Sequence, residues 1–427
     1  MKWLLRLILI CMLVIPLEVK AESPIQKGEK LDLQRCIDLA VANHPSILAA
    51  RSSIKVNESR AGQAKANYYP QINMQAGYNR ISPATAGTRL TKSGEYDEYA
   101  SNLNLTQNIF DFGKTSTLVQ IQNLNTESAR MDFHAVEAQI ILGVKQAYFT
   151  FVQAEKNLEV AREIVKQFQI HLDQAKGFFD VGMKPKFDVT KAEVDLSNAK
   201  LNFIKAENAF RIARVNLNNA MGITDVLEYA VEGNLLFEKY GIDFQDALKK
   251  AYEARPDLRA AMTKVEAGNQ SRELAKKGYY PYVMGNANWS YDGQEFPLDK
   301  SWNVGAMLNI PLFSGFLTKN QVSEAEAALD VLKANELTLR LQIRLEVEQA
   351  YSSLLETIDS TSTAQLAVRQ AEENVDLANG RYTAGVGNPI EVADALVSLS
   401  NARTNYIAAL TGYKMAQASL EKAMGVK

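Results

Sequence analysis

The most regular pattern in the chain is an alanine at every seventh position, which occurs twice, 203 residues apart. Bulkier apolar residues alternate with these alanines at the same spacing. A strict seven-residue apolar repeat makes α-helices supercoil around a partner, and alanine lets the helix axes approach closely. The pattern therefore predicts two tightly packed coiled-coil helices and not an enzyme built around a cleft. The alanines are Ala192, Ala199, Ala206, Ala213 and Ala220, followed by Ala395, Ala402, Ala409, Ala416 and Ala423.

Each alanine repeat follows a longer helical pattern. The first of these patterns runs from about residue 114 to about residue 179, which corresponds to roughly 100 Å of helix at 1.5 Å per residue. Because glycine and proline interrupt helices, we expect a turn after each pattern and hence one long helical hairpin in each half of the chain. The turn residues are Gly182 and Pro185 in the first half, and Gly385, Gly387 and Pro389 in the second.

Four segments alternate with a period of two, which is typical of β-strands. Apolar residues such as Ile72 and Met74 alternate with asparagine and glutamine, and aromatic residues such as Tyr68 and Tyr280 lie near the strand ends. Strands of about ten residues with one apolar face and one polar face match a transmembrane barrel with a wet lumen. The alternative is a soluble, half-buried sheet, which the uncharged polar face and the aromatic residues disfavour. The segments lie at about 71–79, 102–106, 283–291 and 302–310.

Four strands cannot close a barrel. An open sheet edge in lipid would leave backbone groups without hydrogen-bond partners. Small barrels need about eight strands, and three copies of four strands would supply twelve. The barrel hypothesis therefore requires the chain to associate with itself.

The order of these elements is duplicated along the chain. His44-Pro45 corresponds to Arg255-Pro256, and Tyr69-Pro70 corresponds to Tyr280-Pro281, in both cases 211 residues later. The offset then falls to 203, so the first half carries eight extra residues between Tyr78 and Ile109, which we expect in a surface loop. We therefore predict two repeats, 22–222 and 223–427, each with short helices, two strands and a long hairpin.

The first 21 residues have the composition of a secretory signal peptide. Lys2 and Arg6 form a charged start, and Leu7–Ile15 form an apolar centre. Nowhere after them is there an apolar run of 18 residues, so no transmembrane helix is expected, and a membrane-spanning form would have to be a closed barrel. The net charge of −2 without a basic cluster argues against a nucleic-acid partner.

The chain shows no pattern of catalytic or metal-binding residues. Three histidines are present, and none has metal-ligand spacing with another histidine, a cysteine or a carboxylate. Cys36 is the single cysteine after the predicted signal, so no intramolecular disulfide is expected. We find no nucleophile with an adjacent base. The sequence therefore predicts neither an enzyme nor a bound cofactor.

Taken together, these motifs resemble the TolC-like outer membrane efflux protein family, over nearly the whole mature chain. Each motif is weak alone, but their duplicated order is specific. The resemblance rests on Leu31-Asp32-Leu33, Pro45, Pro256, Tyr69-Pro70, Tyr280-Pro281, Pro311-Leu312-Phe313-Ser314-Gly315, Arg381-Tyr382, Gly385 and Glu391-Val392.

The resemblance implies a fold, a location and partners. The fold would be mainly α-helical with a transmembrane β-barrel: a homotrimer with a twelve-stranded β-barrel in outer membrane lipid and an α-helical barrel in the periplasm. The protein would be the passive exit duct of a tripartite efflux or type I secretion system. It would work with a periplasmic adaptor (membrane fusion) protein and an inner-membrane pump of RND or ABC type. The exported cargo is not indicated.

The resemblance also implies site residues. Asp188, Tyr382, Glu391 and Asp394 would line the periplasmic entrance, and the tip residues Gly182, Pro185, Gly385, Gly387 and Pro389 would dock the adaptor. Gly387 stands where the family has a gating arginine, which is a departure from the pattern. Lys191 occupies the first-half position that corresponds to Asp394. From the residues alone, the three carboxylates have a simpler interpretation as solvated helix-start residues that favour the positive end of the helix dipole.

Two other functions predict a different order of elements. A periplasmic adaptor would have one helical hairpin flanked by β-domains, whereas this sequence predicts two hairpins and asparagine-rich strands. A structural coiled-coil protein or adhesin would lack strands at corresponding places in both halves. The duplicated strands therefore favour the channel.

Overall fold

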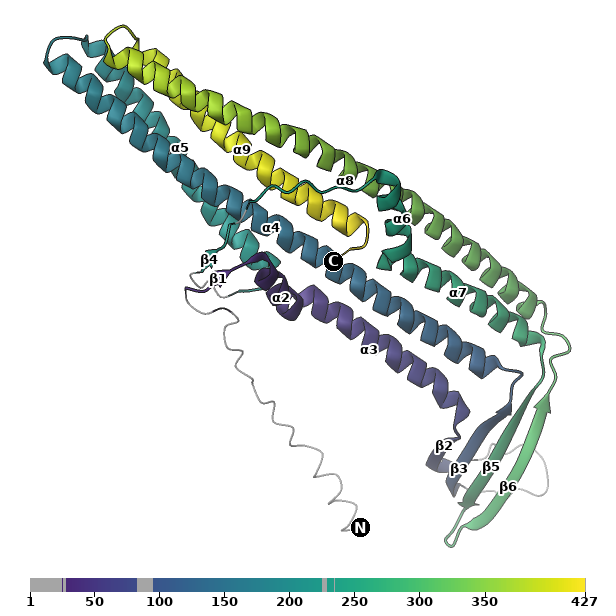
Figure 1. Cartoon of the computed structure of the whole chain (residues 1–427). Coiled ribbons are helices and arrows are strands. Elements are labelled where there is room, and N and C mark those ends of the chain that lie inside the picture. The colour runs from purple at the N-terminus through teal and green to yellow at the C-terminus, as the bar shows by residue number, and fades with distance from the viewer. Residues whose placement is uncertain (1–24, 26–27, 83–94, 225–228, 234, 427) are drawn as a thin grey trace. The chain divides into compact units, whose positions relative to one another are not determined.

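The computed structural model describes residues 25, 28–82, 95–224, 229–233 and 235–426. The predicted signal peptide and the middle of the extra loop of the first half lie outside these residues. In the first half, the predicted order of elements is confirmed (Figure 1). The elements are β1 (Lys30–Leu31), α2 (Leu33–Asn43), α3 (Pro45–Lys65), the 3-10 turn η1 (Ala66–Tyr68), β2 (Gln71–Ile81), β3 (Tyr96–Phe110), α4 (Lys114–Asp180) and α5 (Lys186–Ala220).

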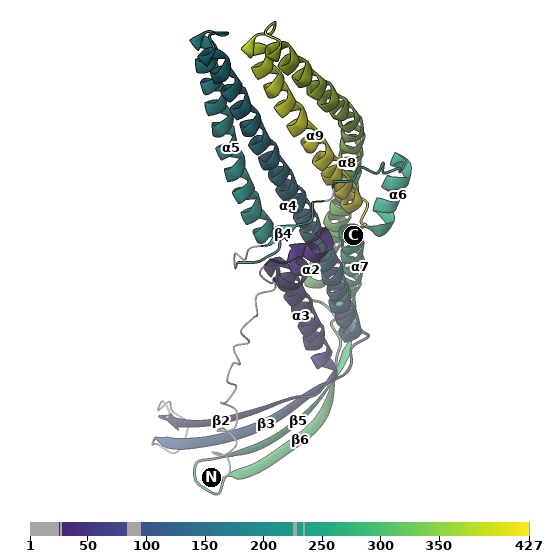
Figure 2. The same cartoon turned by 60° about the vertical axis from the view of Figure 1, so that its left-hand side comes forward.

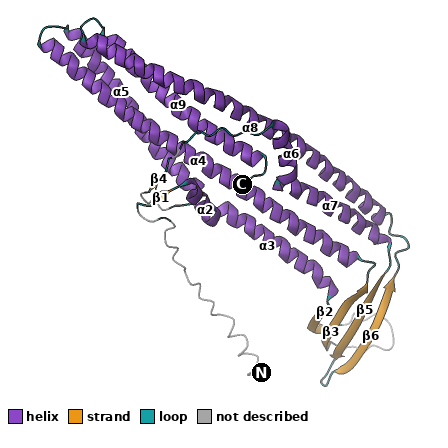
Figure 3. Ribbon diagram, viewed as in Figure 1, coloured by secondary structure: helices purple, strands orange, loops and turns teal. Residues whose placement is uncertain are grey.

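The second half repeats this order (Figure 3). Its long helix has the same length as that of the first half, 67 residues. The matching order of elements in the two halves confirms the duplication that the sequence motifs predict. The elements are β4 (Ala230–Val231), α6 (Phe244–Ala254), α7 (Pro256–Lys276), the 3-10 turn η2 (Lys277–Tyr279), β5 (Tyr282–Gly293), β6 (Asp299–Asn309), α8 (Leu317–Thr383) and α9 (Pro389–Ala423).

The four long strands form one antiparallel sheet in the order β2-β3-β5-β6 (Figure 2). The register aligns side chains of one kind across all four strands. One row consists of Asn73, Asn104, Asn288 and Asn303, and the neighbouring row on the opposite face consists of Ile72, Leu105, Ala287 and Val304. The polar and apolar faces that the alternation predicts are therefore present, and each extends across the whole sheet.

The chain divides into two compact units, and each contains parts of both repeats. The tip unit comprises the described residues up to His44, together with Val144–Leu236 and Asn374–Ile407. The sheet unit comprises Pro45–Gly143, Phe237–Glu373 and the described residues from Ala408 onward. The long helices pass from one unit into the other, so the sequence repeats and the compact units are different divisions of the same chain.

The alanine repeat contributes to the packing of the tip unit. Ala192, Ala199 and Ala213 are buried, as the seven-residue pattern predicts, whereas Ala206 is half-buried. Ala206 lies in a groove of about 600 Å³ together with residues of α4 and of the middle of α9. Ala220 at the end of α5 is also half-buried, so in the single chain the packing is complete around Ala192, Ala199 and Ala213 and incomplete around Ala206 and Ala220.

Ala247, Leu258, Val347 and Leu420 belong to the apolar core of the sheet unit. Next to this core, the guanidinium group of Arg255 is buried and binds two carboxylates. Its Nη2 lies 2.6 Å from Oδ2 of Asp257, and its Nη1 lies 2.7 Å from Oε2 of Glu346. Nη1 also donates a hydrogen bond to the carbonyl oxygen of Ala423 at 3.3 Å. Arg255 thus joins the start of α7 to α8 and to the end of α9.

Candidate functional site: the hairpin tips

The two hairpin turns lie at the same end of the tip unit (Figures 1 and 2). In the first turn, the backbone N–H of Gly182 donates to the carbonyl oxygen of Phe179 at 2.9 Å. In the second turn, the N–H of Gly385 donates to the carbonyl oxygen of Tyr382 at 3.1 Å. Pro185 precedes α5, and Pro389 is the first residue of α9. The predicted tip residues therefore occupy equivalent turns.

Tyr382, predicted at the entrance, is completely buried between the two hairpins. Its ring centroid lies 5.1 Å from that of His171 and 5.6 Å from that of Phe178, both on α4. The ammonium group of Lys184 lies 5.4 Å from the centroid of the same ring. The Tyr382 hydroxyl and both ring nitrogens of His171 are buried without a hydrogen-bond partner among the described residues.

The buried environment shifts the pKa of both Tyr382 and His171. Burial, with a smaller contribution from the nearby charge of Asp188, raises the pKa of Tyr382. Burial lowers the pKa of His171 against the opposing influence of Asp195 and Asp188, because a charged imidazolium is poorly solvated there. Both side chains are therefore neutral near pH 7.

The four predicted entrance residues separate into two groups. Asp188 is buried in the first turn of α5 and acts electrostatically on Tyr382. Glu391 and Asp394 are exposed on α9. Oε2 of Glu391 lies 3.1 Å from Nε of Arg381, so an ion pair within the second hairpin compensates its charge. The structure brings Asp188 and Tyr382 together and leaves Glu391 and Asp394 on the surface.

Lys191 has its own partner. Its Nζ lies 2.7 Å from Oδ2 of Asp195, one turn further along α5. Asp195 therefore compensates the charge of Lys191.

Gly387 occupies a position where the backbone leaves no room for a side chain. A Cβ atom there would lie 2.7 Å from the backbone nitrogen of Tyr382 and 2.8 Å from the carbonyl carbon of Arg381. Its carbonyl oxygen accepts a hydrogen bond from Nζ of Lys184 at 3.3 Å. Lys184 and His171 did not emerge from the sequence as site residues. The duplication offset of 203 residues does link Lys184 to Gly387, whereas nothing in the sequence indicates the pocket around His171.

Metal and thiol chemistry find no support at these positions. Within the part of the chain that the structure describes, no group of three histidine, cysteine or acidic side chains is arranged to hold a metal ion. Cys36 is buried, and burial raises the pKa of its thiol to about 12, so it is protonated and unreactive.

Among the described helices, none combines the length and apolar character needed to cross a membrane.

Two long helical hairpins and a four-stranded sheet give this chain the fold of solved outer membrane channels. The family described as "Outer membrane efflux protein" matches residues 36–223 and 247–426. The chain belongs to this family. It is therefore an outer membrane efflux channel with a periplasmic helical domain, and it is not an enzyme.

Individual relatives agree with this assignment. Protein CyaE of Bordetella pertussis is 25% identical over 90% of this chain and 82% of its own length. Outer membrane protein TolC of Vibrio cholerae is 23% identical over 92% of this chain and 90% of its own length. The crystal structure of the outer membrane protein VceC from Vibrio cholerae matches with a TM-score of 0.79 at 20% identity, covering 92% of this chain and 96% of that chain. This structural match supports the fold.

Proposed function

We propose that three copies of this chain form one export duct, in which their sheets close a twelve-stranded barrel. The observation that carries this proposal is the open sheet. Within the described residues no strand pairs with the outer edge of β2 or of β6, and each of these strands is eleven residues long. Long unpaired edges in a membrane leave backbone hydrogen-bonding groups unsatisfied. Joining β2 of one copy to β6 of the next removes both edges.

An exposed apolar stripe on α5 gives independent support for self-association. Successive residues of the stripe are separated by seven or fourteen positions, and at least half of each residue is exposed in the single chain. They are Phe187, Val194, Leu201 and Val215. A seven-residue apolar stripe is stabilised by packing against another helix. A helix of a neighbouring copy would bury this stripe and continue the helical barrel.

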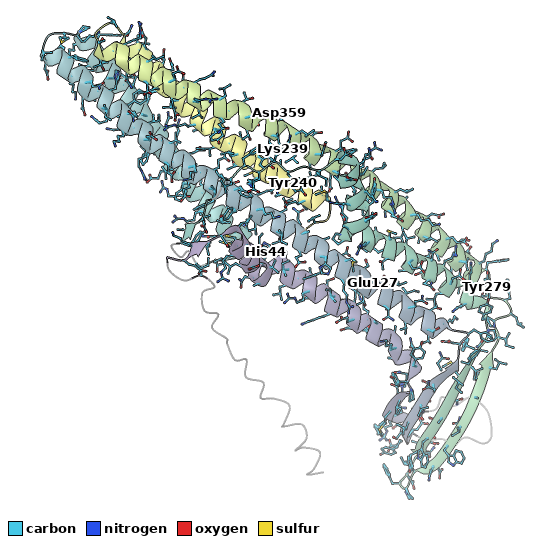
Figure 4. All side chains as sticks on the ribbon, in the orientation of Figure 1. His44, Glu127, Lys239, Tyr240, Tyr279 and Asp359 are labelled. Carbon is cyan, nitrogen blue, oxygen red and sulfur yellow. The ribbon has the colours of Figure 1, made fainter. Side chains whose placement is uncertain are left out.

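The two sheet faces suit a barrel with a wet lumen. The row that contains Ile72 would face lipid, and the asparagine row that contains Asn73 would face the lumen. Tyr279 lies where the helices lead into the strands (Figure 4), and its neighbour Tyr280 and Phe313 are also exposed. Aromatic side chains favour the boundary between lipid and water. The hairpin tips would then lie in the periplasm.

We further propose that the tips form the periplasmic entrance and the docking site of a periplasmic adaptor protein. Asp188, Tyr382, Glu391 and Asp394 would form the entrance, and the turns that contain Gly182, Pro185, Gly385, Gly387 and Pro389 would contact the adaptor. Exposed Val181, Met183 and Val386 provide apolar contact area at both turns. An inner-membrane pump of RND or ABC type would supply the energy, in a tripartite efflux or type I secretion system.

Native mass spectrometry of the detergent-extracted protein tests the assembly. We expect a trimer, and a stable folded monomer would contradict the proposal. Leu201→Asp places a charge in the α5 stripe and should shift the protein toward monomers, because a buried unpaired charge is strongly unfavourable. Lys200→Gln changes the charge by the same amount at an exposed position on another side of the same helix and should leave the trimer intact.

Channel recordings test the entrance. Carboxylates at a narrow opening attract multivalent cations, and salt weakens the attraction because screening acts over about 10 Å at 0.1 M. A trivalent cation on the tip side should therefore block the current, and Glu391→Ala with Asp394→Ala should relieve the block. The ion pair with Arg381 should make the wild-type block modest. An unchanged block in the double variant would place these carboxylates outside the entrance.

A further inference from the structure

One side chain of the first hairpin bridges to the second. Nζ of Lys184 donates to the carbonyl oxygen of Gly387 at 3.3 Å and lies 5.4 Å from the ring centroid of Tyr382. Lys184 and Gly387 are also equivalent positions of the two repeats, since they are 203 residues apart. The two copies of one ancestral position are therefore in contact, and the cation is supplied by the first hairpin.

The second hairpin has little capacity to supply such a cation itself. At Gly387 a side chain would collide with the backbone of Arg381 and Tyr382. The nearby guanidinium group of Arg381 is exposed and pairs with Glu391 of its own hairpin. The absence of a side chain at Gly387 also leaves its carbonyl oxygen accessible to Lys184. The local backbone thus excludes a long side chain at Gly387 and provides an acceptor for a cation from outside.

We propose that Lys184 is the latch of this channel: it holds the two hairpin tips of one protomer together, and opening of the entrance breaks its contacts with Gly387 and Tyr382. This inference rests on the proposed function, in which the tips form the entrance. A charged donor strengthens the hydrogen bond, and the face of an aromatic ring attracts an ammonium group. Half-burial of Lys184 reduces competition from water, and the buried carboxylate of Asp188 acts on the same Tyr382 side chain.

The latch differs from a simple packing contact because it depends on charge. Lys184→Met keeps most of the side-chain length and its apolar stem but removes the ammonium group. Lys184→Arg keeps the charge and offers further donors. Lys186→Met is the matched control, since Lys186 is a neighbouring lysine that is exposed at the start of α5.

Hydrogen exchange of the full-length protein in detergent measures the latch directly. In Lys184→Met we expect amide exchange in peptides covering 380–390 to become about tenfold faster, because the tip opens more often once both contacts are lost. Lys184→Arg should restore slow exchange, and Lys186→Met should match the wild type. Unchanged exchange in Lys184→Met, or equally fast exchange in Lys186→Met, would overturn the inference.

Single-channel recording separates this inference from the proposed function. If the tips form the entrance, Lys184→Met should raise the conductance of the resting channel, and Lys184→Arg should not. Faster exchange without a change in conductance would keep Lys184 as the contact that holds the hairpins, but it would refute its role as a channel latch and the position of the entrance at the tips. A conductance change without faster exchange would overturn the latch and leave the entrance in place.

Discussion

The two corners where a short helix precedes a proline show how the repeats have diverged. At the first corner His44 precedes α3 (Figure 4), and at the second corner Arg255 precedes α7. In both repeats a glycine that follows the return helix packs against this corner. A Cβ atom on Gly222 would lie 2.8 Å from Cα of His44, and one on Gly425 would lie 2.9 Å from the nitrogen of Arg255. The backbone contact is duplicated.

The side-chain chemistry is not duplicated. Arg255 is 4% exposed and binds Asp257 and Glu346, whereas the equivalent positions of the first repeat are His44, Ser46 and Gly143. The close backbone contact requires a glycine in both repeats. The ion pairs require both an arginine and its carboxylate partners, and the sequence has these only in the second repeat. The comparison teaches that a glycine maintains the backbone geometry of both corners, and that the second corner adds the ion pairs of Arg255 with Asp257 and Glu346.

Removal of these ion pairs should give the largest effect. Arg255→Met removes the buried guanidinium group from Asp257 and Glu346, while Nζ of Lys422 stays 3.5 Å from Oε2 of Glu346, and it should lower the free energy of unfolding by about 3 kcal/mol. Ser46 and Gly143 stand where the second repeat has Asp257 and Glu346, so His44→Met leaves no carboxylate unpaired at these two positions and should cost less than Arg255→Met. Denaturant unfolding of both variants would check this, and equal losses would show that the ion pairs of Arg255 do not make the second corner special.

Substitution of the corner glycines tests the shared backbone. Gly222 has a φ of 71° and Gly425 a φ of 76°, where an alanine is strained in addition to its steric clash. Gly222→Ala and Gly425→Ala should each lower the free energy of unfolding by about 2 kcal/mol, and the two losses should be similar. Gly412→Ala in α9 is the control, because its Cβ would make an ordinary contact with the side chain of Thr357 on α8 at 3.7 Å, and the substitution should be neutral or stabilising. Thermal melting compares the three, and unequal corner losses would contradict the duplicated contact.

Acid should weaken the ion pairs of the second corner. Burial alone would raise the pKa of Asp257 and Glu346, but the hydrogen bonds and charge of Arg255 outweigh burial and lower both values. A carboxylate with a lowered pKa stabilises the fold above its ordinary pKa of about 4, and this stability is lost as the pH falls through the lowered value. The variant Asp257→Asn with Glu346→Gln should therefore lose less stability than the wild type between about pH 5 and pH 3. Parallel acid-unfolding curves would contradict this assignment.

The two long helices also differ near the hairpin tips, where one carries a titratable histidine and the other does not. His171 is buried on α4, whereas the equivalent residue on α8 is Asn374. Tyr382 on α8 and Asp188, Lys191 and Asp195 on α5 act on or contact its ring. Because burial lowers the pKa of His171, tip packing is fully stable above the ordinary histidine pKa of about 6.5 and weakens as the pH falls below it.

His171→Phe should remove this pH dependence and retain the ring contact with Tyr382. The measurement is conductance of the resting channel at about pH 5.5 and pH 8. His134→Gln is the control, since His134 is a half-buried histidine on the same helix that lies beside Glu137. The same acid response in wild type and His171→Phe would exclude His171 as its origin.

The smallest effect is expected at the exposed ion pair of the second tip. Arg381 and Glu391 are 57% and 45% exposed, and an ion pair in water contributes little. Arg381→Met should change the free energy of unfolding by less than about 0.5 kcal/mol. A loss close to that of Arg255→Met, measured in the same denaturant series, would mean that neighbouring copies bury this pair.

The sequence by itself determined the duplicated order of elements. Seven-residue and two-residue periods report which face of a helix or strand is apolar, and glycine and proline mark where an element stops. These are local properties, so the long helices, the strand faces and the two turns followed from residue spacing. The tip residues Gly182 and Gly385 were found for the same reason, because a turn is specified by its own residues.

The tertiary structure decided which of the tip residues meet. Sequence reasoning grouped Asp188, Tyr382, Glu391 and Asp394, yet the fold buries the first two and exposes the last two. Burial and pairing depend on contacts between helices that are far apart in sequence, such as the 203-residue separation between Lys184 and Gly387. Periodicity carries no information about such contacts, because it specifies the face of a helix and leaves open what packs against that face. The pocket of Tyr382, the partner of Lys184 and the ion pairs of Arg255 therefore became visible only in three dimensions.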